Sequence, residues 1–231
     1  MLKNDLPDLD ARWIIEARTG FDFSDLIARG DEKISNEILA LVQNDLDQRL
    51  SGKPLSKIYR EKEFFGRTFK VSEDTLDPRP DTEVLIEKVL KRFKSNPPKT
   101  ILDLGAGTGC ILITLLKELP NTTGVGVDVS IAALEIAKQN AKIHDVDERL
   151  KFLQSDWFEN VEGSFDLIVS NPPYIDANVI PNLEKEVRNH DPILALDGGK
   201  DGLDAYRQIF SQTFLHLNPG GKLFVEIGYD Q

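Results

Sequence analysis

Cysteine is almost absent from this sequence, because its 231 residues include a single one, Cys110. An intrachain disulfide is therefore excluded, and the composition suits a reducing compartment. No apolar run approaches the ~18 residues that a transmembrane helix needs. The first residues, MLKNDLPDLD, lack the apolar core of a signal peptide. The sequence thus predicts a cytoplasmic protein that makes no contact with a membrane.

An excess of basic charge is also missing, since the net charge is −11. A protein that holds nucleic-acid phosphates needs a basic surface, so this balance disfavours nucleic acid as a partner. The three histidines are scattered, and no Cys/His spacing is typical of a metal site. We therefore expect neither a metal nor a nucleic-acid partner.

The N-terminal part of the chain has a helical pattern. Apolar residues recur at three- and four-residue steps over 34–50, where Ser35 or Asn36 can cap the start of a helix. A second helix is expected over 10–20, ended by Gly20. These segments predict a small helical bundle, which either has no chemistry of its own or docks a substrate.

A β-hairpin is expected next, because apolar and polar residues alternate around a Gly-Arg pair over 61–71. The following segment, 77–93, has a helical pattern that Asp81 or Thr82 can cap. These changes of pattern divide the chain into three parts. They are a helical substrate-binding domain at 1–58, a β-hairpin linker at 59–77 and a larger domain at 78–231.

From residue 100 onward, strand and helix patterns alternate. Near-continuous apolar runs predict strands at 100–105, 123–128, 150–154, 165–170 and 222–228. Helical patterns fall near 109–118, 130–143 and 202–216. Buried strands joined through helices form a parallel sheet that is covered on both faces, so the predicted fold class is α/β.

The first strand-to-helix turn, 103-DLGAGTG-109, is rich in glycine. Gly105, Gly107 and Gly109, with Ala106 and Thr108 between them, let the backbone pass close to a ligand at a helix N-terminus. A dinucleotide-binding turn would have its third glycine at position 110, where this chain has cysteine. The spacing therefore argues against NAD, and a tight turn without a ligand is the alternative.

The next two strand ends carry polar and aromatic residues. Asp128 can accept hydrogen bonds from both hydroxyls of a ribose, or it can cap the following helix. Asp156 can accept from an exocyclic amine, and Trp157 can stack on a purine or lie in the core. Parallel strands end at one edge of a sheet, so these groups meet there. They predict an adenosine ligand without pyrophosphate, and S-adenosylmethionine fits best.

The fourth strand end is 171-NPPY-174, where two prolines hold the backbone rigid. The side-chain oxygen of Asn171 and the carbonyl of Pro172 can accept the two N–H groups of an amide or aromatic amine, while Tyr174 packs on its planar face. Positive charge grows on the nitrogen during methyl transfer, so these acceptors bind the transition state better than the ground state. A rigid turn without chemistry is the alternative.

Together these motifs resemble those of the HemK/PrmC family, the release factor glutamine methyltransferases. The matching blocks are 77-DPRPDTE-83, 101-ILDLGAGTG-109, 126-GVD-128, 154-QSDWF-158, 168-IVSNPPYI-175 and 186-EVRNHDPILALDGGKDGLDAY-206. The resemblance implies a Rossmann-like class I S-adenosylmethionine-dependent methyltransferase sheet with a small N-terminal helical domain. It also implies that 78–83 forms part of the wall around cofactor and substrate.

The resemblance assigns roles to the strand ends. Residues 105–109 and Asp128, with Asp156, Trp157 and Asn171 beside them, would bind S-adenosylmethionine. Asn171, Pro172, Pro173 and Tyr174 would bind the substrate glutamine. The implied reaction is N5-methylation of the glutamine in the Gly-Gly-Gln motif of class 1 peptide chain release factors, with S-adenosylhomocysteine as the other product.

Other functions stay open at this point. One is methylation of a ribosomal-protein glutamine or of adenine-N6 in nucleic acid, and another is cofactor binding without turnover. The family continues with two more strands after the position of residue 231, so the apolar strand 222–228 is expected to lie at an open sheet edge. We expect a monomer that can self-associate through this edge.

Overall fold

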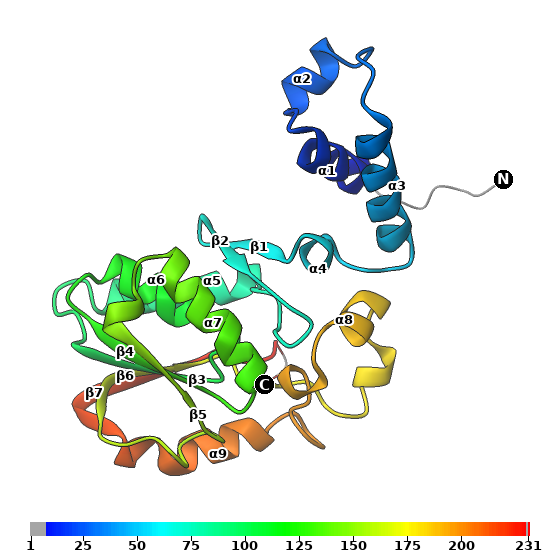
Figure 1. Ribbon diagram of the computed structural model, residues 1–231. Helices are drawn as coiled ribbons and strands as arrows, with labels where there is room; N and C mark the ends of the chain where they lie inside the picture. The colour runs from blue at the N-terminus through cyan, green and yellow to red at the C-terminus, as the bar shows by residue number, and fades with distance from the viewer. Residues whose placement is uncertain (1–7, 230) are drawn as a thin grey trace. The chain divides into compact units, whose positions relative to one another are not determined.

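The computed structural model describes residues 8–229 and 231 of the chain (Figure 1). The chain divides into two compact units between Tyr59 and Arg60. No helix among the described residues is long and apolar enough to cross a membrane. In the same residues no cluster of histidine, cysteine and acidic side chains could hold a metal ion.

The first unit is helical, as its sequence pattern predicts. Its helices are α1 (Asp8–Thr19), α2 (Phe23–Ala28), α3 (Asn36–Leu50) and α4 (Leu55–Tyr59). Ser35 caps α3, because its side chain accepts a hydrogen bond from the backbone N–H of Ile38. Gly20 follows the end of α1 in the left-handed conformation, with φ of +73°. The short helices α2 and α4 were not predicted from the sequence.

A buried carboxylate holds the first unit together. Asp45 of α3 is fully buried, and it accepts hydrogen bonds from Arg18 of α1 at 2.6 Å and from the Tyr59 hydroxyl at 2.8 Å. Burial alone would raise the pKa of Asp45, but these two donors outweigh burial and lower it. The carboxylate thus joins α1, α3 and α4.

The second unit begins with an antiparallel hairpin of β1 (Glu61–Phe64) and β2 (Arg67–Lys70). The helix α5 (Pro80–Arg92) follows. The expected cap at Asp81 or Thr82 is wrong, because the N-cap is Arg79 and Asp81 and Thr82 lie in the first turn. Pro80 decides this start: its fixed φ suits the first helical position, where the N–H that it lacks would have no helical partner.

A five-stranded parallel sheet forms the centre of the second unit, which confirms the predicted α/β fold. Its strands are β3 (Thr100–Leu104), β4 (Thr123–Asp128), β5 (Leu150–Gln154), β6 (Phe165–Ser170) and β7 (Leu217–Val225). They lie side by side in the order β5-β4-β3-β6-β7. The last strand begins before the predicted residue 222, with an irregular register opposite Phe165 and Leu167.

Helices cover both faces of this sheet. The remaining α-helices are α6 (Cys110–Glu118), α7 (Ile131–Ile143), α8 (Lys185–His190) and α9 (Asp204–Gln212). Short 3-10 helices span Asp147–Arg149, Ile180–Asn182, Ile193–Ala195 and Thr213–Leu215. Figure 1 shows α5, α6 and α7 on one face and α9 on the other.

Alternate residues of the strands enter two separate apolar clusters. Ile101 and Leu167 pack with residues of α5, α6 and α7, whereas Leu102 and Ile168 pack with Ile209 of α9. All five side chains are fully buried. The strand β7 lies at one edge of the described sheet, and self-association through this edge stays a prediction.

Candidate functional site

The strand order places the candidate site at a topological switch point. From β3 the chain moves to one side, through β4 and β5, and then to the other side, through β6 and β7. In open α/β sheets, ligands bind in the crevice outside the carboxyl ends of the strands at such a reversal. The glycine-rich turn follows β3 and the NPPY segment follows β6, so both border this crevice.

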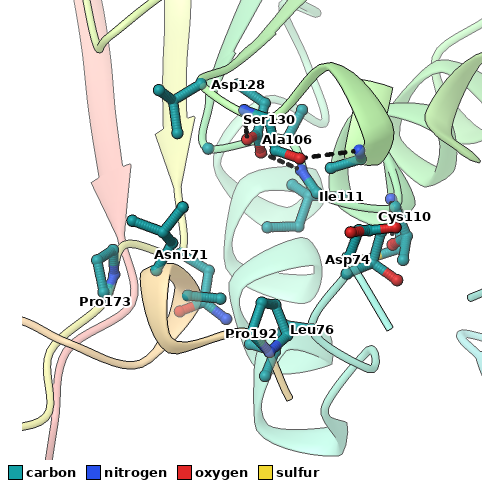
Figure 2. A pocket seen from close by; sticks show the side chains of 18 of the residues that line it. Asp74, Leu76, Ala106, Cys110, Ile111, Asp128, Ser130, Asn171, Pro173 and Pro192 are labelled. Carbon is teal, nitrogen blue, oxygen red and sulfur yellow. Dashed lines mark hydrogen bonds between the residues drawn. The ribbon is translucent and has the colours of Figure 1, made fainter. Parts of the chain in front are cut away.

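A cavity of about 410 Å³ lies at these strand ends, a volume within the range of small-molecule sites. The strand-end residues that line it include Gly105, Asp128, Trp157 and Asn171. Its opposite wall comes from the segment 74–79 before α5 and from residues near Pro192. Figure 2 shows Asp128, Ser130, Asn171 and Pro173 around this pocket, together with Leu76 and Pro192.

The glycine-rich turn leaves room for a ligand at two of its glycines. Gly105 and Gly107 have φ of +73° and +53°, and a Cβ built on either would meet no atom within 4 Å. Ala106 and Thr108 also line the cavity. Gly109 does not line it: there a Cβ would lie 2.9 Å from the Ile113 side chain, so this glycine permits packing beneath the turn.

Asp128 fixes the glycine-rich turn against the next helix. One carboxylate oxygen accepts from the N–H of Gly107 at 2.8 Å, and the other accepts from the N–H of Ser130 at 2.9 Å. Ser130 is the N-cap of α7, so the alternative that Asp128 itself caps this helix is wrong. Each carboxylate oxygen can accept a second hydrogen bond, so ribose binding stays a prediction.

The turn after β5 fixes the backbone conformation at Trp157 and thereby the direction of its side chain. The hydroxyl of Ser155 donates to the carbonyl of Trp157 at 3.0 Å and accepts from the N–H of Asn160. Trp157 has φ of +47°, a conformation that a bulky residue rarely adopts. Its half-buried ring packs on the core and also borders the cavity, while Asp156 is exposed at the rim.

The NPPY segment divides between the cavity and its surroundings. Asn171 and Pro173 line the cavity, whereas Pro172 is buried and Tyr174 lies outside the lining. The side-chain nitrogen of Asn171 donates to the hydroxyl oxygen of Thr82 at 3.1 Å. The amide oxygen of Asn171 has no such partner among the described residues, so it can accept from a substrate.

The loop 196–199, which contains Gly198 and Gly199, packs against the backbone at Tyr174 and Ile175. The N–H of Ile175 donates to the carbonyl of Leu196, and the N–H of Gly198 donates to the carbonyl of Ile175. A Cβ at Gly198 would lie 2.8 Å from the Cα of Tyr174, closer than real Cβ contacts come. The loop therefore fixes the path of the backbone through Tyr174.

Sequence reasoning did not select Asp103 as a site residue. This carboxyl is fully buried just before the glycine-rich turn, and neither oxygen has a hydrogen-bond partner among the described residues. Burial raises its pKa to about 7, with a contribution from the negative charge of Asp128. An acidic residue inside an apolar strand was the signal that could have revealed it.

Arg79 and Asp191 were also missed as individual site residues, although both lie in blocks that carry the family resemblance. They form an ion pair at 2.6 Å, in which the Asp191 side chain is 5% exposed. The pair joins the segment before α5 to the segment that continues into Pro192 and Leu194, and both segments line the cavity. It therefore closes one wall of the site.

Comparison with known proteins adds family descriptions and relatives. The PrmC N-terminal domain matches residues 2–59, and the methyltransferase small domain matches residues 70–188. A release factor glutamine methyltransferase of Agrobacterium fabrum is 42% identical over 229 residues, which are 97% of this chain and 79% of the relative. One of Cereibacter sphaeroides is 45% identical over 222 residues, covering 96% of this chain and 78% of the relative.

The fold has a counterpart among solved structures. The crystal structure of a methyltransferase from Pyrococcus furiosus aligns with a TM-score of 0.53 and 22% sequence identity. The alignment covers 80% of this chain and 79% of that chain. At this identity the likeness concerns the fold.

Proposed function

This chain belongs to the release factor glutamine methyltransferase family, and we propose that it methylates the side-chain amide of a glutamine in peptide chain release factors. The substrate is the Gly-Gly-Gln glutamine of class 1 release factors, and the methyl donor is S-adenosylmethionine. The observation that carries the proposal is Asn171, whose amide donates to Thr82 and leaves its oxygen free beside the cavity.

The residues around the cavity suit S-adenosylmethionine, which when bound supplies a methyl group activated by a sulfonium charge. Gly105 and Gly107 have open space where side chains would otherwise stand. Asp128 and Trp157 would hold the ribose and the adenine, with Asp156 at the rim.

The NPPY residues would hold and orient the substrate amide. The Asn171 oxygen and the Pro172 carbonyl accept its two N–H groups, and Pro173 and Tyr174 pack against its plane. These acceptors turn the nitrogen lone pair toward the methyl donor and stabilise the positive charge that develops on nitrogen. Holding the amide in this orientation contributes much of the acceleration, because well-oriented groups reach effective molarities of ~10⁵ M or more.

The first unit would dock the protein substrate. It exposes several large apolar side chains, among them Trp13, Leu39 and Leu41, which suit a protein surface. A nucleic-acid substrate is disfavoured by the net charge of −11. We place the encounter with the release factor in the cytoplasm.

The test is methylation of a purified class 1 release factor with radiolabelled S-adenosylmethionine, followed by mapping of the label by mass spectrometry. Label on the Gly-Gly-Gln glutamine that disappears with Asn171→Ala supports the proposal. Label on another residue or on nucleic acid would overturn the substrate assignment. Calorimetry with S-adenosylhomocysteine separates a failure to bind the cofactor from a failure to use this substrate.

A further inference from the structure

A carboxylate that the sequence motifs do not include contacts Tyr174 of the NPPY segment. Glu226 follows the end of β7, and its Oε2 atom is buried with no hydrogen-bond partner among the described residues. Its Oε1 atom accepts a long hydrogen bond of 3.4 Å from the hydroxyl of Tyr174. Neither Glu226 nor Tyr174 is part of the cavity lining, so this contact lies outside the cavity.

Three polar side chains surround this carboxylate. Burial raises the pKa of Glu226 above its ordinary value, although the neighbouring side chains of Thr82, Tyr174 and Asn171 act to lower it. Lowering of a carboxyl pKa is the effect of a donor, because a donated hydrogen stabilises the ionised form. The hydroxyl of Tyr174 donates to the carboxylate, and the Asn171 amide and the hydroxyl of Thr82, which is 2% exposed, lie beside it.

The direction of the hydrogen bonds follows from these partners. An ionised carboxylate only accepts, and a threonine hydroxyl has a single hydrogen to donate. When the hydroxyl of Thr82 donates its hydrogen to Glu226, the hydroxyl oxygen of Thr82 can only accept a hydrogen bond from Asn171. The side-chain nitrogen of Asn171 does donate to that oxygen, at 3.1 Å. The reversed amide would place its oxygen against a second oxygen, without a hydrogen between them.

We infer that Glu226 and Thr82 are positioning residues that fix which end of the Asn171 amide faces the substrate. The inference rests on the proposed function, in which the Asn171 oxygen accepts an N–H of the glutamine amide. Glu226 acts on Asn171 directly and through Thr82, because both side chains lie beside the carboxylate and Asn171 donates to Thr82. Glu226 also holds the Tyr174 hydroxyl, so one carboxylate orients both ends of the NPPY segment.

Glu226→Gln tests the direction of the hydrogen bonds around Asn171. Glutamine has the same size as glutamate, but one end of its side-chain amide donates a hydrogen bond instead of accepting one. Thr82→Val removes the hydroxyl at similar volume, and Thr82→Ser restores it. We expect kcat to fall roughly tenfold to a hundredfold in Glu226→Gln and Thr82→Val, because a misplaced acceptor loses transition-state stabilisation. The affinity for S-adenosylhomocysteine should stay within about twofold, and Thr82→Ser should recover most of the rate.

Two variants serve as matched controls. Glu87→Gln removes a carboxylate charge from the exposed face of α5. Thr114→Val removes a fully buried hydroxyl that has no hydrogen-bond partner in the described part of the chain and lies outside the cavity lining. Neither should change kcat. A similar loss of rate in the controls would overturn the specific role of Glu226 and Thr82.

An independent measurement does not need the methyl acceptor. In the nitrogen–proton NMR spectrum, the side-chain amide of Asn171, assigned by its loss in Asn171→Asp, should shift in Thr82→Val and in Glu226→Gln and stay in place in Glu87→Gln. An unchanged signal in Glu226→Gln overturns the inference. So does a shifted signal with an unchanged kcat. A wild-type chain that methylates no release factor contradicts the proposed function, while the spectra still decide the orientation of Asn171.

Discussion

Replacing Asp103 by asparagine should remove a pH dependence from the stability of the second unit. The carboxyl has a pKa of about 7 in the folded chain, raised by burial from the ordinary value of 3.8. A group whose folded pKa is raised stabilises the fold at low pH, and this contribution is lost as the pH rises through the folded pKa. The wild-type chain therefore becomes less stable between pH 4 and pH 7 through this group.

The magnitude follows from the size of the shift. Each pKa unit corresponds to about 1.4 kcal/mol, so the raised pKa of Asp103 lowers the free energy of unfolding by about 4 kcal/mol at pH 8 and by about 3 kcal/mol less at pH 5, where the folded carboxyl is protonated. Between these two values the wild-type chain should lose about 3 kcal/mol that the Asp103→Asn variant keeps. The buried amide has a desolvation cost of its own, but that cost does not vary with pH.

Urea unfolding at both pH values measures this difference, with free energies extrapolated to water. Wild type and variant share the histidines and the other titrating groups, so the contributions of these groups to the pH dependence cancel in the comparison. Free energies that change in parallel for wild type and variant would show that Asp103 is not held in an apolar site. The reasoning about its carboxyl would then be refuted.

Gly198→Ala should strongly disturb the NPPY segment, because its Cβ would meet the Cα of Tyr174 at 2.8 Å; loss of methyl transfer together with a lower melting temperature would support this, and an unaffected enzyme would contradict it. Arg79→Ala should weaken S-adenosylhomocysteine binding roughly tenfold, which calorimetry measures, since it breaks the ion pair to Asp191 that closes one wall. Cys110 should resist alkylation in the native chain, because burial raises the pKa of its thiol to about 12; rapid labelling without denaturant would rule this out.

The sequence determined the secondary structure of the sheet domain closely. The strands predicted at 123–128, 150–154 and 165–170 have those bounds in the structure. These segments are apolar runs between helical patterns, and such local composition is typical of strands that are buried on both faces of a sheet. The predicted start of α5 was wrong, because a proline at the first helical position outweighed two residues that often cap helices.

The glycine-rich turn and the NPPY segment were also readable from the sequence, since positive φ and fixed φ are properties of the residue types themselves. The environment of a side chain is not such a property. Asp103 is one acidic residue among many in the sequence, and only the packed sheet leaves both of its oxygens without a partner.

Only the tertiary structure determined which end of the Asn171 amide faces the cavity. Thr82 and Asn171 are 89 residues apart in the chain, and Tyr174 and Glu226 are 52 apart. The sequence could show that an amide stands at a strand end, but not which of its two ends faces the cavity. That choice depends on the donors and acceptors that packing brings within about 3 Å, because a hydrogen bond has a direction and falls off steeply with distance.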